Sequence, residues 1–423
     1  MIDYLGKEKG RVIEECTECG ACARECPVLR KTELRNEPPE EIQKKVKAFL
    51  RTGRPDAVVF TRAFSCMECF KCVEDTCPEG LNSLFINEMI KWEYRRNRVL
   101  ETHYDDPKDI RAPQRVIASI QVSPEEYKRI FTPTPVRRTK YLFFPGCNVY
   151  SQPEKILTAM DILDLTGVDY SFVPGCDSCC GDVYRFSGSL EKALKSSKLL
   201  VKELARYSPE TVIFWCPTCH CRFRKTIPLT EEVPFSTVSF AQFLASKMDT
   251  LPLRKPIHAR ATLHEACKSA FTGIDLNGAR DVLKKIPGIS LLEAPHHGKD
   301  TVCCGSGAIS FFPESFEAVR DFRLQEVSEM DIDILVDVCH FCHETFCGQQ
   351  PKYPYSVVNY VNLAAQAIGL RREDKFKGFM RCVNPDKILK AAEENIKGSP
   401  YSPGEIVAAV RKRFGRGEEQ FSS

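Results

Sequence analysis

The stretch CTECGACARECP, residues 16–27, decides how the N-terminal part of the chain folds. Its cysteines follow the spacing C-x2-C-x2-C-x3-C-P, and a second run, CMECFKCVEDTCP at residues 66–78, repeats it with one additional residue before the last cysteine. In such a run the first three thiols bind one cubane 4Fe–4S cluster, and the thiol before the proline binds a neighbouring cluster. The two runs therefore predict two cubane clusters that exchange their fourth ligands.

This rule divides the eight thiols into two ligand sets. The first set is Cys16, Cys19, Cys22 and Cys77, and the second set is Cys66, Cys69, Cys72 and Cys26. Zinc is the alternative, but it prefers two cysteine pairs closed into a tetrahedron over three evenly stepped thiols followed by proline. Between the runs, PPEEI at residues 38–42 precedes apolar residues at helical spacing, so we expect one helix there and another at 82–98.

The whole chain has 423 residues, of which 22 are cysteine. Its first residues lack the apolar stretch of a signal peptide, and no apolar run of about 18 residues indicates a transmembrane helix. We therefore expect thiols that bind metal instead of forming disulfides, a cytoplasmic location and no direct membrane insertion. The net charge of +3 gives no indication of a nucleic-acid partner.

Ten further cysteines form two sets with one common pattern. The first set reads C-x31-C-C-G-x34-C-x2-C and the second reads C-x35-C-C-G-x33-C-x2-C, and equivalent cysteines are 120 to 124 residues apart. A duplication explains the repetition. The sets consist of Cys147, Cys179, Cys180, Cys216 and Cys219, and of Cys267, Cys303, Cys304, Cys339 and Cys342.

Short apolar segments, such as 141–144 and 212–215, alternate with helical patterns in this part of the chain. The alternation predicts a mostly parallel sheet with covering helices. Several of the cysteines follow such segments, and the carboxyl ends of parallel strands gather at one edge, so we expect each set to converge there. Gly181 and Gly305 are expected to let the backbone approach a metal closely.

Two cysteine runs followed by two Cys-Cys-Gly sets resemble the heterodisulfide reductase family, in the arrangement that fuses a ferredoxin-like portion to CCG domains. The resemblance covers residues 10–370 and includes Phe144-Pro145-Gly146-Cys147 and Cys216-Pro217-Thr218-Cys219. Leu263-His264-Glu265-Ala266-Cys267 and Cys339-His340-Phe341-Cys342 in the second set are less typical. The N-terminal part is similar to the α-helical ferredoxin domain of this family and of succinate dehydrogenase iron–sulfur subunits. The resemblance implies one noncubane 4Fe–4S cluster for each five-cysteine set.

The expected fold class is α+β overall, with an N-terminal α-helical ferredoxin domain followed by two duplicated α/β (CCG) domains with mostly parallel sheets. The expected boundaries are 1–103 for the ferredoxin domain, 104–138 for a linker, 139–255 and 256–370 for the CCG domains, and 371–423 for a helical tail.

The resemblance implies a redox subunit that passes electrons through the cubane pair to the noncubane clusters, which reduce or form a disulfide. His264, His297 and His340 lie near ligand cysteines in the sequence and are candidate proton donors. No nucleotide fingerprint occurs, so we expect a flavoprotein or other redox subunit as partner, or a membrane-bound quinone or cytochrome partner on the inner face of the membrane. The alternative is an electron relay in a larger flavoprotein or metalloenzyme complex, for organic-acid oxidation or acyl-CoA reduction, without disulfide chemistry of its own.

Two other interpretations of the second region stay open at this point. Residues 216–220 and 339–343 both match C-x-x-C-H, the attachment signal of c-type haem, although haem attachment requires export. A thioredoxin-like C-x-x-C pair would leave the Cys-Cys-Gly pairs unexplained. The remaining cysteines are expected to be structural; they are Cys176, Cys221, Cys347 and Cys382.

Overall fold

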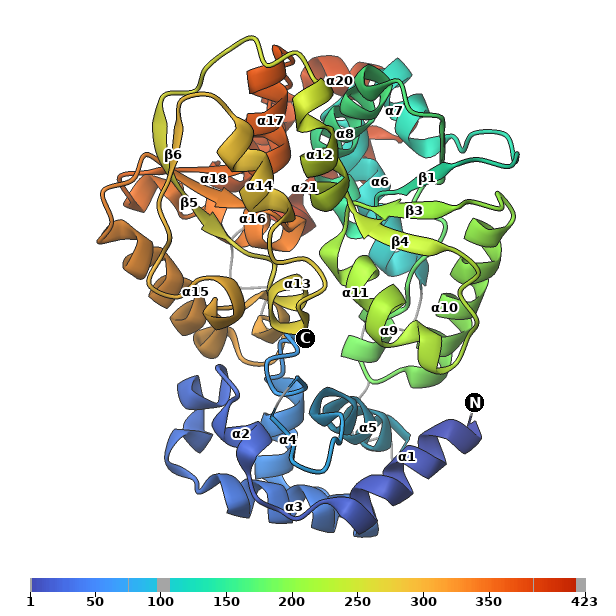
Figure 1. Cartoon of the computed structure of the whole chain (residues 1–423), viewed down its shortest axis with the longest axis vertical. Coiled ribbons are helices and arrows are strands. Elements are labelled where there is room, and N and C mark those ends of the chain that lie inside the picture. Colours follow the sequence, from blue (N-terminus) through green and yellow to red (C-terminus); the bar gives the residue numbers. More distant parts are fainter. Residues whose placement is uncertain (1, 75, 97–106, 383, 416–423) are drawn as a thin grey trace.

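The computed structural model describes residues 2–74, 76–96, 107–382 and 384–415. A helical domain forms one end of the molecule, and two α/β units lie side by side against it (Figure 1). The fold class predicted from the sequence is confirmed: all strand pairs in the described residues are parallel, and they form two four-stranded sheets.

The helical domain is built around the two cysteine runs. Its α-helices are α1 (Ile2–Glu15), α2 (Ala21–Arg24), α3 (Pro39–Thr52), α4 (Ala57–Phe64) and α5 (Ser83–Arg96). α3 begins with Pro39, carries Glu40 and Glu41 in its first turn, and ends at Gly53, whose φ of 68° suits a left-handed cap. α3 and α5 confirm the two predicted helices.

The first α/β unit has the strand order β2-β1-β3-β4. Its elements are β1 (Tyr141–Phe144), α8 (Pro153–Thr166), β2 (Tyr170–Phe172), α9 (Asp182–Phe186), α10 (Leu190–Ala205), β3 (Thr211–Phe214), α11 (Pro217–Lys225), β4 (Ser236–Ser239) and α12 (Phe240–Lys247). The two central strands, β1 and β3, are the apolar segments that the sequence indicated, and their side chains are almost completely buried.

The second α/β unit repeats this topology with the order β6-β5-β7-β8. Its elements are β5 (Ala259–His264), α13 (Cys267–Thr272), α14 (Gly278–Lys285), β6 (Ile289–Leu291), α15 (Pro313–Ser328), β7 (Ile334–Asp337), α16 (His340–Cys347), β8 (Ser356–Asn359) and α17 (Tyr360–Ile368). The shared order confirms the duplication predicted from the cysteine spacing.

Further helices lie before, and after, the two sheets. In the region expected to be a linker, α6 (Pro107–Ser119) and α7 (Pro124–Phe131) pack against the first α/β unit. The C-terminal helices are α18 (Lys375–Arg381), α19 (Pro385–Ala391), α20 (Glu393–Lys397) and α21 (Pro403–Phe414). α21 packs against α6 and buries Ile406, Val410 and Phe414 in the core that also holds the second sheet. The domain boundaries themselves stay a prediction.

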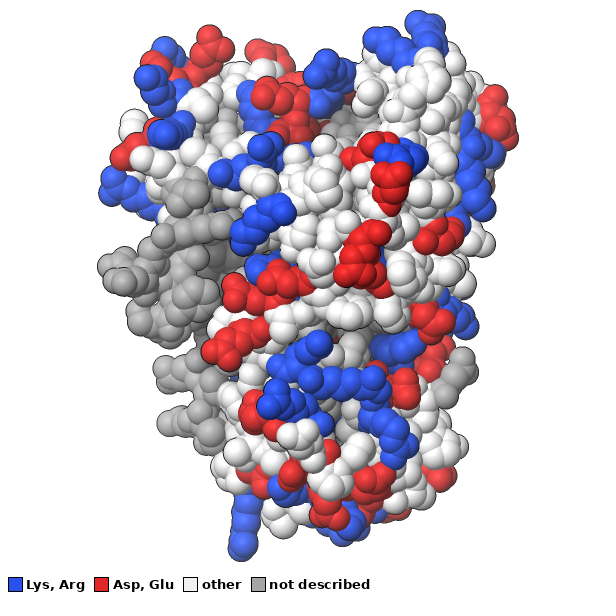
Figure 2. All heavy atoms as spheres, turned by 90° about the vertical axis from the view of Figure 1, so that its left-hand side faces the viewer, with Lys and Arg blue, Asp and Glu red and all other residues white. Residues whose placement is uncertain are grey.

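Charge is mixed on the surface. On the face shown in Figure 2, Lys and Arg are interspersed with Asp and Glu over both ends of the molecule. None of the helices in the described parts of the chain combines the length and the apolar character needed to span a bilayer.

Candidate metal centres and active site

Eight predicted ligands surround two small pockets in the helical domain. One pocket is lined by Cys16, Cys19, Cys22 and Cys77, and the other by Cys26, Cys66, Cys69 and Cys72. The structure thus groups the thiols in the same two sets that the sequence rule assigned, with the last cysteine of each run at the other run's pocket.

The two runs share a backbone conformation that turns their thiols inward. Glu18 and Gly20 in the first run, and Glu68 and Phe70 in the second, have φ values between 52° and 72°. Three of these four residues are not glycine, and side chains adopt this left-handed conformation only where the surroundings enforce it. The repeated pattern indicates that both loops are shaped by the need to direct three successive thiols to one side.

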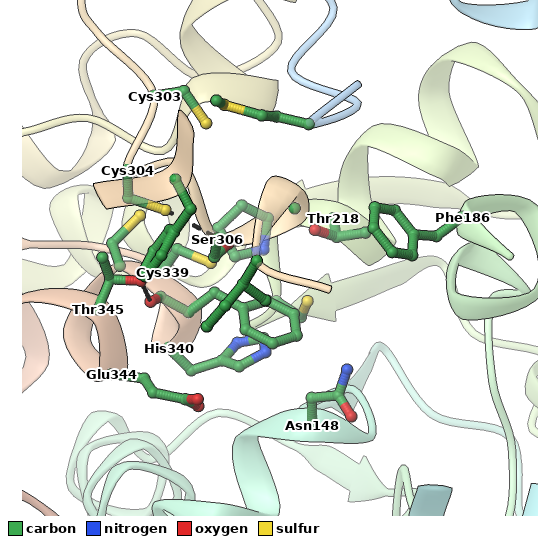
Figure 3. A pocket seen from close by; sticks show the side chains of 18 of the residues that line it. Asn148, Phe186, Thr218, Cys303, Cys304, Ser306, Cys339, His340, Glu344 and Thr345 are labelled. Atoms are coloured by element: carbon green, nitrogen blue, oxygen red, sulfur yellow. Dashed lines mark hydrogen bonds between the residues drawn. The ribbon is translucent and has the colours of Figure 1, made fainter. Parts of the chain in front are cut away.

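All ten cysteines of the two Cys-Cys-Gly sets line one cavity of about 930 Å³. Cys147 and Cys216 follow the central strands β1 and β3, and Cys267 and Cys339 follow the equivalent strands β5 and β7. Because the carboxyl ends of both sheets face this cavity, distant parts of the sequence meet in it. Figure 3 shows Cys303, Cys304 and Cys339 together with Asn148, Phe186 and Thr218 of the first unit.

Within each set, sulfur atoms lie close to one another. The Sγ–Sγ distance is 3.9 Å between Cys147 and Cys179 and 3.5 Å between Cys180 and Cys219. In the second set, the Sγ atoms of Cys267 and Cys303 are 3.6 Å apart. In the first half these sulfurs come from three separate segments, and in the second half from two, so each half presents a compact group of soft donors.

The glycines after the Cys-Cys pairs lie where the chain packs closely against two helices. Gly181 and Gly305 both have φ of 88°, and a Cβ atom would lie 2.5 Å from the Ala193 carbonyl oxygen and 3.0 Å from the Phe316 carbonyl oxygen, respectively. The glycines are therefore needed because the chain passes close to α10 and α15. Their N–H groups donate to sulfur, Gly181 to Cys179 at 3.3 Å and Gly305 to Cys303 at 3.5 Å.

Of the three candidate proton donors, His340 lines the cavity. It is the first residue of α16 and its side chain is buried. Neither ring nitrogen has a hydrogen-bond partner among the described residues, but the sulfurs of Cys216 and Cys339, one from each set, are near enough to act on the charge of the imidazole. Burial opposes the charge on the ring, but these sulfurs outweigh burial and raise the pKa of His340 to about 10. Gln152 of the first unit donates to the His340 carbonyl oxygen at 2.9 Å and anchors the helix start.

The other two candidates lie outside the residues that line the cavity. His264 is fully buried and accepts a hydrogen bond from Arg323 Nε at 3.2 Å, while burial and the Arg323 charge lower the pKa of His264 to about 4. His297 is exposed, and its Nδ1 atom is 2.7 Å from the Ala294 carbonyl oxygen. Among the cysteines expected to be structural, Cys176, Cys221 and Cys347 are buried, and all four lie outside the cavity lining.

The sequence did not reveal a buried ionic network where the three domains meet. Arg222 of α11 pairs with Glu68 at 2.6 Å and Glu88 at 3.0 Å in the helical domain, and with Asp182 at 2.6 Å. Lys268 of the second unit also pairs with Asp182, at 2.9 Å. Because Glu68, Asp182 and Lys268 stand next to or near cysteines of the second run and of both Cys-Cys-Gly sets in the sequence, the network fixes these cysteine-bearing segments relative to each other.

Comparison with known proteins agrees with this arrangement. A 4Fe-4S dicluster domain matches residues 15–82, and a cysteine-rich domain, CCG, matches residues 141–224 and 261–346. The chain belongs to the iron–sulfur proteins that combine a 4Fe-4S dicluster domain with two CCG domains. These matches confirm the iron–sulfur and CCG predictions.

The chain is similar to the D subunit of dihydromethanophenazine:CoB–CoM heterodisulfide reductase. In Methanosarcina barkeri this protein is 22% identical over 402 residues, which cover 85% of this chain and 94% of that protein. The B subunit of the CoM/CoB fumarate reductase of Methanothermobacter marburgensis is 25% identical over 354 residues, which cover 80% of this chain and 68% of that protein. These relatives are oxidoreductase subunits, and they confirm the predicted resemblance to heterodisulfide reductase and the oxidoreductase class.

Among solved structures, an aspartate racemase of Picrophilus torridus aligns with 56% of this chain and 98% of its own at 14% identity, with a TM-score of 0.26.

Proposed function

We propose that this chain is a redox subunit of the heterodisulfide reductase type that reduces a disulfide, or forms one in the reverse direction, between its α/β units. The observation that carries the proposal is the single cavity lined by all ten Cys-Cys-Gly cysteines. The helical domain would hold two cubane 4Fe–4S clusters with the two ligand sets around its pockets, and each five-cysteine set would hold one noncubane 4Fe–4S cluster.

The residues present fit these cofactors. Each small pocket brings four cysteines together and the large cavity brings ten together, and such concentrations of thiols suit iron–sulfur clusters better than hard cations such as Mg²⁺ or Ca²⁺. Backbone N–H groups of Gly181 and Gly305 already point at ligand sulfurs, and such hydrogen bonds are common around cluster thiolates. When bound, the clusters supply one-electron transfer on both sides of the cavity.

The reaction that the cavity would house needs two electrons and two protons. The S–S bond of the substrate breaks, both electrons come from a separate redox subunit, and each sulfur leaves as a thiol. His340 is the residue we assign as donor of one proton, because its imidazole is buried in the cavity lining, beside cysteines of both sets. The second proton would come from water at the open side of the cavity.

The redox partner would be a flavoprotein or another redox subunit of a larger complex. A membrane-bound quinone or cytochrome is the alternative partner. The names of the two relatives, each of them one subunit of a reductase, support a multi-subunit assembly. We propose a cytoplasmic protein that would reach the inner face of a membrane through such a partner.

The proposal is tested with the complete chain, reconstituted anaerobically and supplied with a reduced viologen dye and a panel of small mixed disulfides. We expect two viologen radicals to be oxidised for each disulfide cleaved. Cys339→Ser should abolish this turnover, whereas Cys382→Ser, a half-buried thiol outside the cavity, should not. Full cluster content without cleavage of any disulfide would instead favour an electron relay for organic-acid oxidation or acyl-CoA reduction.

The exchange of ligands between the two runs gives a separate prediction. Cys26 belongs to the first run but lines the pocket of the second, so Cys26→Ser should remove the same low-temperature paramagnetic signal as Cys69→Ser. Cys77→Ser should instead remove the same paramagnetic signal as Cys19→Ser. Electron paramagnetic resonance of the four variants, with Cys382→Ser as control, checks this. If Cys26→Ser removed the same paramagnetic signal as Cys19→Ser, the predicted exchange of ligands between the two runs would be contradicted.

A further inference from the structure

Arg62 of α4 is a buried cation between the two pockets of the helical domain. Only 1% of its surface is exposed, and its Nη2 atom donates to Cys22 Sγ at 3.1 Å, in the first ligand set. Its side chain also lines the pocket of Cys26, Cys66 and Cys72, which belong to the second set. One guanidinium therefore faces thiols of both sets.

Among the described residues, Arg62 pairs with no carboxylate, unlike the other fully buried cations. Arg222 pairs with Glu68, Arg323 with Glu326 at 2.6 Å, and Lys155 with Glu154. A guanidinium stays charged in proteins, and burying it without a counter-charge is strongly unfavourable. The groups next to Arg62 that can supply negative charge are the cysteine sulfurs, and their proximity opposes the effect of burial and raises its pKa.

We propose that Arg62 is the shared counter-charge of the two cubane sites, a positioning residue that makes both clusters easier to reduce. The inference rests on the proposed cubane pair and extends it. Reduction adds negative charge to a cluster, and a fixed positive charge in a medium of low dielectric constant stabilises that state. Because Arg62 faces both ligand sets, its charge also offsets the repulsion between two electrons held on neighbouring clusters.

Gln43 provides a comparison within the same domain. Its side-chain amide lies 3.6 Å from Cys16 Sγ and 3.4 Å from Cys22 Sγ, and both of these thiols belong to the first set. Gln43 carries no charge and lines only the first of the two pockets. Replacing it should therefore affect one cluster, whereas replacing Arg62 should affect two.

The test is a redox titration of the complete chain, followed by electron paramagnetic resonance, after iron and sulfide have been counted. In Arg62→Gln we expect the equilibrium constant for reduction of each cubane cluster to fall at least tenfold, a shift of about 59 mV to more negative potential for a one-electron couple. Arg62→Lys, which keeps the charge, should have reduction potentials close to those of the native chain. Gln43→Leu should shift one cluster alone.

The matched control is Arg51→Gln, which removes the same charge from an exposed position on α3 and should leave both potentials unchanged, because solvent screens it. Unchanged potentials in an Arg62→Gln protein with full cluster content would overturn the inference. If Arg62→Gln does not retain its clusters, the inference is tested with Arg62→Lys. Clusters that are retained, with potentials near those of the native chain, support the role of Arg62 as a counter-charge. Loss of the clusters in Arg62→Lys contradicts it. A native chain without cubane clusters would refute the proposed function instead.

Discussion

Replacing His340 by Pro is expected to slow disulfide reduction by about 10²–10⁴-fold while leaving the iron and sulfide content unchanged, the usual range for removing a general acid. His340 lines the cavity and interacts with one thiol from each cysteine set. Pro is the matched replacement because the first set has Pro217 at the equivalent first position of α11. Proline is well tolerated there, so the variant removes the imidazole and keeps the start of the helix.

The measurement is steady-state disulfide cleavage with reduced viologen, on samples matched for iron content. His297→Asn is the control, because His297 is exposed and lies outside the cavity lining, and its rate should equal that of the native chain. A His340→Pro protein with full clusters and an undiminished rate would show that the protons come from elsewhere.

The second large effect concerns stability. Arg222→Met is expected to lower the free energy of unfolding by about 3–5 kcal/mol, the cost of leaving buried carboxylates without their partner. Arg222 is 1% exposed and contacts three carboxylates from two domains, and Glu68 and Glu88 are equally buried. Arg185 still reaches Glu88, but among the described residues Glu68 keeps only Lys91 at 3.6 Å and Lys268 at 3.8 Å.

Thermal unfolding and limited proteolysis at the junction of the domains would measure this loss. Arg206→Met is the control: Arg206 is exposed and pairs with Glu203 three residues away, so its removal should leave the melting temperature almost unchanged. Equal melting temperatures of the two variants would contradict the idea that the network holds the domains together.

The sequence indicates which thiols of the helical domain come together, because the spacing that groups them is local. The run at 16–27 places three thiols within seven residues, and the spacing alone indicates which thiol belongs to the other cluster. The Cys-Cys-Gly sets are also predictable, since cysteines after central parallel strands must meet at one sheet edge.

Other features escape the sequence because they depend on packing between distant segments. Arg62, Glu88 and Arg222 are residue types that usually lie at the surface, and only the assembled domains show that they are buried. The close packing of Gly181 against α10 is likewise visible only in the structure. By contrast, α7 could have been found: Ser123 and Glu126 form a capping box around Pro124, a signal visible in the sequence.

Whether the chain binds four clusters is measured by the iron and acid-labile sulfide content of the complete chain, prepared anaerobically. We expect about sixteen iron and about sixteen sulfide ions per chain, four of each for every cluster. About eight of each, with zinc in the remaining cysteine sites, would contradict the two noncubane clusters and with them the proposed disulfide chemistry.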